Sequence, residues 1–196
     1  MFSLQIRYLS FFFGLISILS FFNIIYSYYL NLYLNLNTYY WSFLFSLFIS
    51  IFFYKIKVVE KKPSIFSKIL TVFLGYLLLP LVLSIPFYFS IYNLTFLNSF
   101  FESISGFTST GFSIFENIKH IDQSLILWRS STQWIGGLYF LFSIIYLIDI
   151  YDENLKKTLT NFISFNSSEI LKQAVKIFLL YSGLTLLIFI ILNMFS

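Results

Sequence analysis

Cysteine is absent from this chain of 196 residues, and histidine occurs only once, at His120. The first absence excludes disulfide bonds and thiolate metal sites, and the second excludes a cluster of imidazole ligands within one chain. Charged residues are also scarce, at 10% of the total, whereas a typical soluble domain has about 25%. Because 59% of the residues are hydrophobic and the mean hydropathy is +0.86, we expect lipid rather than water to surround most of the chain.

Five apolar runs approach the length of about 20 mostly apolar residues that a membrane-spanning helix requires. They lie near residues 8–30, 38–54, 66–92, 125–148 and 175–194. The first run is longer than the apolar stretch of a signal peptide and no small-residue cleavage site follows it, so we expect it to remain as a membrane helix. The sequence therefore predicts an all-α membrane protein with about five transmembrane helices.

The basic residues lie mainly in two connections between these runs, at residues 55–68 and 156–176, whereas the links near residues 31–37 and 93–124 carry almost none. Lys and Arg gather on the cytoplasmic side of membrane proteins. This pattern predicts that the amino terminus is cytoplasmic and that the carboxyl terminus lies outside. The net charge of +4 is then explained by membrane topology, and no nucleic-acid partner is expected.

The segment between the third and fourth runs is not a simple polar loop. Apolar residues recur at roughly helical spacing up to Phe107, which predicts a helix, and either Thr95 or Asn98 is suited to cap its start. At about 1.5 Å per residue, a helix from Leu97 to Phe107 reaches about 16 Å, roughly half of the hydrocarbon thickness. It can enter the membrane but cannot cross it, so we expect a re-entrant pore helix followed by a loop that returns to the outer side.

The returning loop begins with the small residues Thr108, Ser109, Thr110 and Gly111. Non-helical backbone at membrane depth is tolerated only where it is buried in protein or lines a water-filled cavity, and carbonyl oxygens that face an aqueous path can replace the water shell of a cation. Gly111 allows left-handed backbone conformations, and the carboxyl end of the preceding helix carries partial negative charge. We therefore expect a cation filter in which the Thr and Ser hydroxyls either add ligands or brace the loop.

Two longer motifs surround this loop. Residues 101–113, FESISGFTSTGFS, are followed by Ile121 and Asp122 and by residues 127–137, LWRSSTQWIGG. Together they resemble the first pore repeat of the Trk/Ktr/HKT potassium transporter family, in its TrkH-like branch. The two preceding helices resemble the additional amino-terminal pair of that branch.

On this resemblance the chain divides into three parts. Residues 1–62 hold the amino-terminal helix pair and a cytoplasmic link, residues 63–150 form the first helix–pore–helix repeat, and residues 151–196 form a second link and the first helix of an incomplete second repeat. Members of the family carry four repeats around a central pathway, so one repeat cannot build the filter alone. We expect either a truncated piece of a four-repeat transporter or a homo-oligomer.

The resemblance also implies a function, a site and a partner. It implies uptake of K+, or of K+ and Na+, by a transporter or symporter in the inner membrane of a bacterium, without an organic cofactor. The ion is expected at the carbonyls of Ser109 and Thr110, with Thr108, Gly111 and Phe112 adjoining. The expected partner, besides membrane lipid, is a cytosolic nucleotide-binding regulatory subunit of the TrkA type.

Other functions are weighed against transport. A non-conducting membrane fragment or an assembly subunit is the alternative, because the chain holds only one predicted filter strand. An enzyme is not expected, because the single His, the absence of Cys and the scattered carboxylates provide no nucleophile–base pair and no set of metal ligands.

Two groups of polar residues near the predicted loop each allow two interpretations. Charges inside a membrane are rare and usually paired, so Glu102 and Arg129 either form an ion pair that braces the filter from behind or lie near the aqueous surface and are solvated. Glu116, His120 and Asp122 form either a weak cation-attracting rim at the outer mouth or an ordinary exposed loop.

Three further features concern the helices themselves. Pro80 and Pro86 predict a bend in the third run. Gly136, next to a second glycine, predicts close approach of another backbone. Trp128 and Trp134 are candidates for a belt at the membrane interface.

Overall fold

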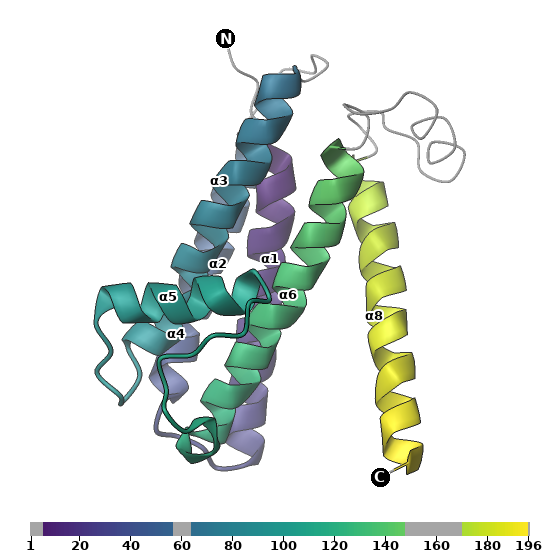
Figure 1. Ribbon diagram of the computed structural model, residues 1–196. Coiled ribbons are helices and arrows are strands. Elements are labelled where there is room, and N and C mark those ends of the chain that lie inside the picture. The colour runs from purple at the N-terminus through teal and green to yellow at the C-terminus, as the bar shows by residue number, and fades with distance from the viewer. Residues whose placement is uncertain (1–5, 57–63, 148–169, 196) are drawn as a thin grey trace. The chain divides into compact units, whose positions relative to one another are not determined.

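The computed structural model describes residues 6–56, 64–147 and 170–195 (Figure 1). Within these ranges every regular element is helical and no strand is present, which confirms the predicted all-α class. The described residues up to Tyr139 form one compact unit, and those from Phe140 onward form a second. In chain order the elements are α1 (Ile6–Tyr29), α2 (Leu36–Lys55), α3 (Ile65–Leu83), α4 (Ile85–Tyr88), α5 (Phe96–Phe107), the 3-10 helix η1 (Ile118–His120), α6 (Gln123–Leu147) and α8 (Ile170–Phe195).

Four helical segments of the described residues are long and apolar enough to cross a membrane, and they correspond to four of the five predicted runs. The remaining run, the fourth (residues 125–148), forms α6, whose 25 residues are long enough to cross, but the polar residues 129–133 make it less apolar than the others. The four segments are Tyr8–Tyr29 in α1, Leu36–Lys55 in α2, Ile65–Tyr88 across α3 and α4, and Val175–Met194 in α8.

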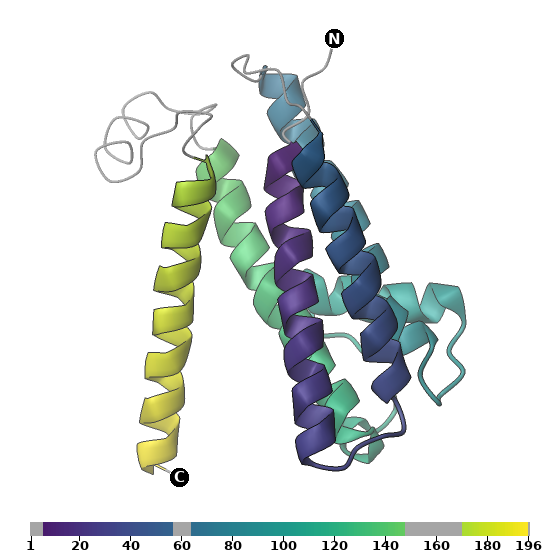
Figure 2. The same cartoon turned by 180° about the vertical axis from the view of Figure 1, so that it is seen from behind.

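Small polar residues join α1 to α2, which lie side by side (Figure 2). Ser10 Oγ donates to the Ser50 carbonyl and Ser50 Oγ donates to the Ser10 carbonyl, both at 2.9 Å. Nearer the other end of the pair, Ser20 Oγ donates to Ser42 Oγ at 3.1 Å. Small residues and interhelical hydrogen bonds are typical of helix pairs that associate in lipid, where no hydrophobic driving force operates between them.

The third predicted run is broken into α3 and α4 at Ser84. Pro86 lies in the first turn of α4, where its missing N–H and fixed φ are tolerated. The indole Nε1 of Trp128 donates to the carbonyl of Leu83 at 3.0 Å, and Trp128 is fully buried. The prediction that Trp128 belongs to an interfacial belt is therefore wrong, because its ring is needed inside the protein to satisfy a carbonyl at the helix break.

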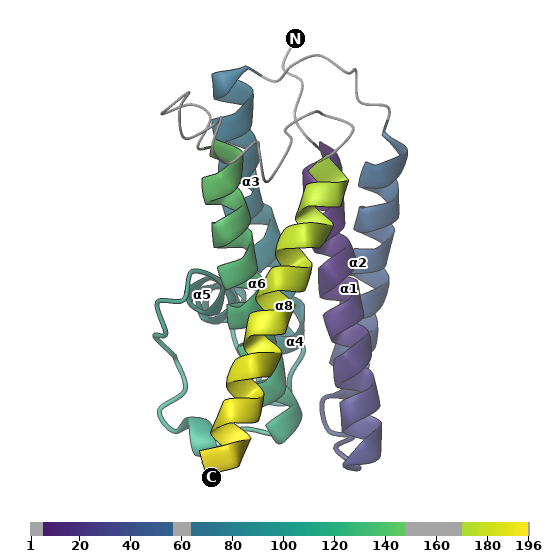
Figure 3. The same ribbon diagram turned by 90° about the vertical axis from the view of Figure 1, so that its right-hand side faces the viewer.

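The short helix α5 lies across the direction of α3 and α6 in Figure 1 and is seen nearly end-on in Figure 3. It crosses α6 at two glycines: a Cβ on Gly136 would overlap the backbone of Phe107, and a Cβ on Gly106 would lie 2.5 Å from Thr132 Oγ1. The predicted close approach at Gly136 is confirmed. The expectation that the length of α5 measures how far it enters the membrane is not confirmed. The two glycines let α5 cross α6 at an angle instead of running beside it.

The crossing nevertheless sets the depth at which α5 ends. At about 1.5 Å per residue, Gly136 lies about 20 Å along α6 from Gln123. Phe107, the last residue of α5, contacts Gly136, so the chain must then return along about 20 Å of α6 to reach its start. The segment after α5 therefore begins near the middle of a long helix, as expected for a re-entrant loop.

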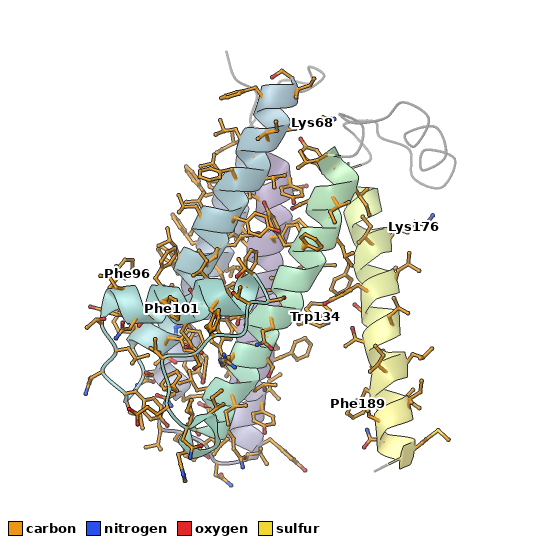
Figure 4. All side chains as sticks on the ribbon, in the orientation of Figure 1. Lys68, Phe96, Phe101, Trp134, Lys176 and Phe189 are labelled. Carbon is orange, nitrogen blue, oxygen red and sulfur yellow. The ribbon has the colours of Figure 1, made fainter. Side chains whose placement is uncertain are left out.

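The second unit contains the end of α6 and all of α8. The apolar side chains of α8 are largely exposed in this unit, for example Leu186 and Phe189, each at 63% (Figure 4). A helix that is apolar on all sides is typical of a segment surrounded by lipid or by more protein.

We expect Gly136→Ala to destabilise the protein, because the added methyl group would overlap the Phe107 carbonyl and force α5 away from α6. Overpacking of this kind costs about 1–3 kcal/mol, which thermal unfolding in detergent micelles would detect. Gly183→Ala in α8 is the matched control, because no atom lies within 4 Å of the new Cβ and Ala favours a helix. Equal unfolding temperatures for the two variants would contradict the described crossing.

Candidate functional site

The segment that follows α5, here called the return loop (residues 108–122), begins with a tight turn that uses the last carbonyls of the helix. The amides of Thr108, Ser109 and Thr110 donate to the carbonyls of Ile104, Gly106 and Ser105 at 2.8, 3.0 and 3.1 Å. At the other end of α5, Thr95 Oγ1 accepts from the amide of Asn98 at 3.3 Å. Of the two residues predicted to cap this helix, Thr95 is therefore the cap.

Two residues of the return loop have left-handed backbone conformations. Gly111 has φ 81° and Ser109 has φ 56°. A Cβ on Gly111 would meet no atom within 4 Å, so glycine is required by the backbone angle and not by lack of space. The conformation of Gly111 was expected from the sequence, whereas that of Ser109 was not, because a serine adopts positive φ only rarely.

The five carbonyls predicted to bind the ion fall into two groups. Those of Thr108, Ser109 and Thr110 accept no hydrogen bond within the described part of the chain, and all three residues are exposed. The carbonyls of Gly111 and Phe112 each lie 3.4 Å from Arg129 Nη2. Three carbonyls are thus available to a ligand, while two face a guanidinium.

The side chains around the turn hold its shape. Thr108 Oγ1 donates to the Ile104 carbonyl at 2.8 Å and contacts Thr110 Oγ1 at 2.8 Å. Ser105 Oγ donates to the Phe112 carbonyl at 2.7 Å. Of the two roles expected for the hydroxyls, the structure shows these engaged in bracing the loop against the end of α5.

Glu102 and Arg129 form an ion pair behind the loop. The Glu102 side chain is 0% exposed and that of Arg129 is 12% exposed, so the carboxylate is not solvated. Besides Arg129 Nε, the carboxylate accepts hydrogen bonds from Ser113 Oγ at 3.1 Å and from the amide of Ile114 at 3.0 Å. The alternative of two solvated charges is excluded by this burial, whereas the role of the pair in supporting a filter stays a prediction.

Burial on α5 is the reverse of that on a helix in a water-soluble protein. Its polar and small residues, including Ser99, Glu102 and Ser103, are buried, whereas Phe96 and Leu97 are 52% and 75% exposed. Figure 4 labels Phe96 and Phe101 on this helix. Apolar residues normally lie inside a protein surrounded by water, so this arrangement fits a helix whose outer face contacts lipid or another apolar protein surface.

A buried polar network holds the far end of the return loop, and sequence reasoning missed it. Asn35, in the link between α1 and α2, is fully buried; its Nδ2 donates to Asp122 Oδ2 at 2.9 Å, and its Oδ1 accepts from the amide of Ile91 at 3.0 Å. Ser124 Oγ donates to the same Asp122 oxygen at 2.6 Å and contacts Tyr39 OH at 2.9 Å. Asp122 is thus a structural residue.

The other members of the predicted outer rim differ from Asp122. Glu116 and His120 are exposed, as expected for an ordinary polar loop. No group of three or more His, Cys, Asp or Glu residues that could hold a metal ion occurs among the described residues. Much of the two basic connections lies outside the described residues, so the predicted orientation in the membrane stays a prediction.

Comparison with known proteins finds related transporters. A family model described as "TrkH: Cation transport protein" matches residues 75–196, which is more than half of the chain and includes α5, the return loop and α6. An uncharacterized cation transporter of Methanocaldococcus jannaschii is 31% identical over 110 residues, which cover 55% of this chain and 23% of that protein.

Two bacterial relatives match shorter segments. The Trk system potassium uptake protein TrkI of Halomonas elongata is 42% identical over 60 residues, covering 31% of this chain and 11% of that protein. The Trk system potassium uptake protein TrkH of Escherichia coli K12 is 38% identical over 56 residues, covering 28% of this chain and 12% of that protein. The matched part is therefore less than a quarter of each of these relatives. No solved structure matches the chain.

We expect Arg129→Gln to destabilise the protein more than Glu102→Gln does, because it leaves a carboxylate buried without its cation. Removing one member of a buried ion pair costs about 3–5 kcal/mol, and chemical unfolding in micelles measures the loss. The double variant should recover part of that loss, because two amides bury no charge. Additive losses in the double variant would show that the two side chains are not coupled.

Proposed function

This chain belongs to the TrkH family of cation transport proteins, as its resemblance indicated, and we propose that it supplies one filter strand of a K+ uptake pathway. Two of the relatives are named as potassium uptake proteins, which supports K+ as the transported ion. In this proposal the ion passes the return loop and is bound there by main-chain oxygens. No covalent chemistry is involved.

The observation that carries the proposal is the set of unpaired carbonyls at Thr108, Ser109 and Thr110. These oxygens lie on an exposed turn that directly follows Phe107, whose backbone contacts Gly136 about 20 Å along α6 from its start. Unpaired carbonyls at membrane depth are tolerated only beside a wet cavity or in protein. Oxygen ligands replace the hydration shell of K+. The carboxyl end of α5, which precedes them, adds partial negative charge that favours a cation.

Within the predicted site we assign different roles to the two groups of carbonyls. Ser109 and Thr110, with Thr108 adjoining, are proposed to contact K+. Gly111 and Phe112 are proposed to position the strand, because Arg129 lies 3.4 Å from both of their carbonyls and a cation bound directly there would be repelled by its guanidinium. Glu102 holds that guanidinium in place, and its negative charge offsets the positive charge that Arg129 would otherwise present to the ion pathway.

The proposal also includes the arrangement of the whole protein. Residues 1–62, 63–150 and 151–196 are proposed as the amino-terminal helix pair, the first pore repeat and the start of the second repeat. A complete ring of carbonyls then requires three more strands, from the remaining repeats of a transporter or from further copies. We place the assembly in a bacterial inner membrane with a cytoplasmic amino terminus, bound to a cytosolic nucleotide-binding regulatory subunit.

Potassium uptake by cells that lack their own uptake systems tests this function. The chain alone should support no uptake, because one strand cannot enclose an ion, whereas a chimera that adds the remaining repeats of the Escherichia coli TrkH should support it. A chimera that reaches the membrane without restoring uptake would contradict the proposal. Uptake by the chain alone would instead favour a pathway assembled from several copies of the chain. Crosslinking would then detect oligomers of the chain in the membrane.

Two substitutions in the chimera test whether backbone oxygens are the ligands. Gly111→Ala should lower uptake by about tenfold, because an L-residue with left-handed backbone costs about 1–2 kcal/mol and relaxation would turn the carbonyls away. Ser109→Ala should leave uptake and ion preference nearly unchanged, because it removes a hydroxyl but keeps the carbonyl. A large loss in Ser109→Ala would mean that the side chain, and not the main chain, binds the ion.

A further inference from the structure

An apolar groove lies between α2 and the α3–α4 pair of the first unit. Its volume is about 900 Å³, and every side chain that lines it is apolar. Phe45, Phe48 and Phe52 of α2 form one wall, and Leu78, Leu81 and Ile85 lie in the other. Both walls belong to segments that are long and apolar enough to cross a membrane, so hydrocarbon is the medium expected around the groove.

The α2 wall is a single stripe along one face of the helix. Trp41, Phe45, Phe48 and Phe52 follow each other at intervals of three or four residues, which places them above one another on a helix. Their side chains are 62%, 51%, 68% and 55% exposed, so the described residues do not cover them. The rings of Phe48 and Phe52 are nearly parallel, at 16° with centroids 6.4 Å apart, and present a flat apolar surface.

The same stripe ends in a positive charge. Lys55 is the last residue of α2, three positions after Phe52, and is exposed. Lys68 lies in the first turn of α3, and Figure 4 shows it near the end of that helix. Lys68 is ten residues, or about 15 Å, along α3 from Leu78, the nearest residue of that helix that lines the groove, so Lys55 is the charge next to the groove. An apolar groove that ends in an ammonium group is complementary to an anion that carries an acyl chain.

We propose that this groove binds an anionic phospholipid, with one acyl chain against Phe48 and Phe52 and the head-group phosphate at Lys55. At about 1.5 Å per residue, the stripe from Lys55 to Trp41 is about 21 Å long. One leaflet contributes about half of a hydrocarbon thickness of about 30 Å, so an acyl chain anchored at Lys55 fits within the length of the groove.

The proposed lipid would lie next to the support of the pore helix. Ile85 of the groove wall is two residues from Leu83, whose carbonyl accepts the hydrogen bond from Trp128. On the same helix, the carbonyl of Pro80 accepts from Ser103 Oγ of α5 at 2.8 Å. The groove wall and these two hydrogen-bond acceptors thus share one short stretch of chain, residues 80–85.

Quenching of tryptophan fluorescence by brominated lipid tests the proposal on the full chain. Phe48→Trp places a reporter in the groove at an exposed position, and its added fluorescence is followed in phosphatidylcholine vesicles that contain either brominated phosphatidylglycerol or brominated phosphatidylcholine. Phe189→Trp on α8 is the matched control, because Phe189 is similarly exposed at 63% but does not line the groove. Lys55→Gln in the Phe48→Trp variant removes the proposed head-group contact.

We expect brominated phosphatidylglycerol to quench the groove reporter with about fivefold preference over phosphatidylcholine, as one lysine near a membrane surface provides. Lys55→Gln should abolish the preference, and the α8 reporter should show none. Equal quenching by both lipids at position 48 would reduce the groove to ordinary lipid contact and overturn the proposal. Absence of quenching there would show that another protein segment occupies it, and persistence of the preference in Lys55→Gln would overturn the head-group assignment.

Discussion

The buried carboxylate of Glu102 constrains the surrounding structure more than any other group described in this chain. A carboxylate that has lost its water is stable only with a cation and hydrogen-bond donors around it. Arg129 supplies the cation from α6, while Ser113 and Ile114 supply donors from the return loop. One side chain thus fixes three separate parts of the chain relative to one another.

Arg129 extends this arrangement to the backbone of the candidate site. Its Nε contacts Glu102, while its Nη2 lies within 3.4 Å of the Gly111 and Phe112 carbonyls. The planar guanidinium presents several donors in a fixed geometry, which lets one residue neutralise a charge and orient two carbonyls. The backbone that carries the exposed carbonyls before Gly111 is therefore fixed at both ends. The end of α5 holds one end, and Arg129 holds the other.

Much of this site could be predicted from sequence, because its elements are local. Helical spacing and the cap at Thr95 predict α5, and Gly111 predicts a left-handed turn, as found. The division of the carbonyls could not be predicted, because it depends on how Arg129, 18 residues beyond Gly111, reaches back across the fold. Asn35 and Asp122 are 87 residues apart in the sequence, so their contact depends in the same way on tertiary packing, as does the burial of Trp128. Such packing cannot be read from a single sequence.

The paired serines of α1 and α2 have a mechanical consequence. The hydroxyls of Ser10 and Ser50 each donate a hydrogen bond to the main-chain carbonyl of the other residue, so sliding one helix along the other by even one turn, about 5.4 Å, would break both bonds together. In hydrocarbon no water would replace them. The helix pair α1–α2 should consequently move as one rigid body. Internal movement in the first unit is then expected outside this helix pair.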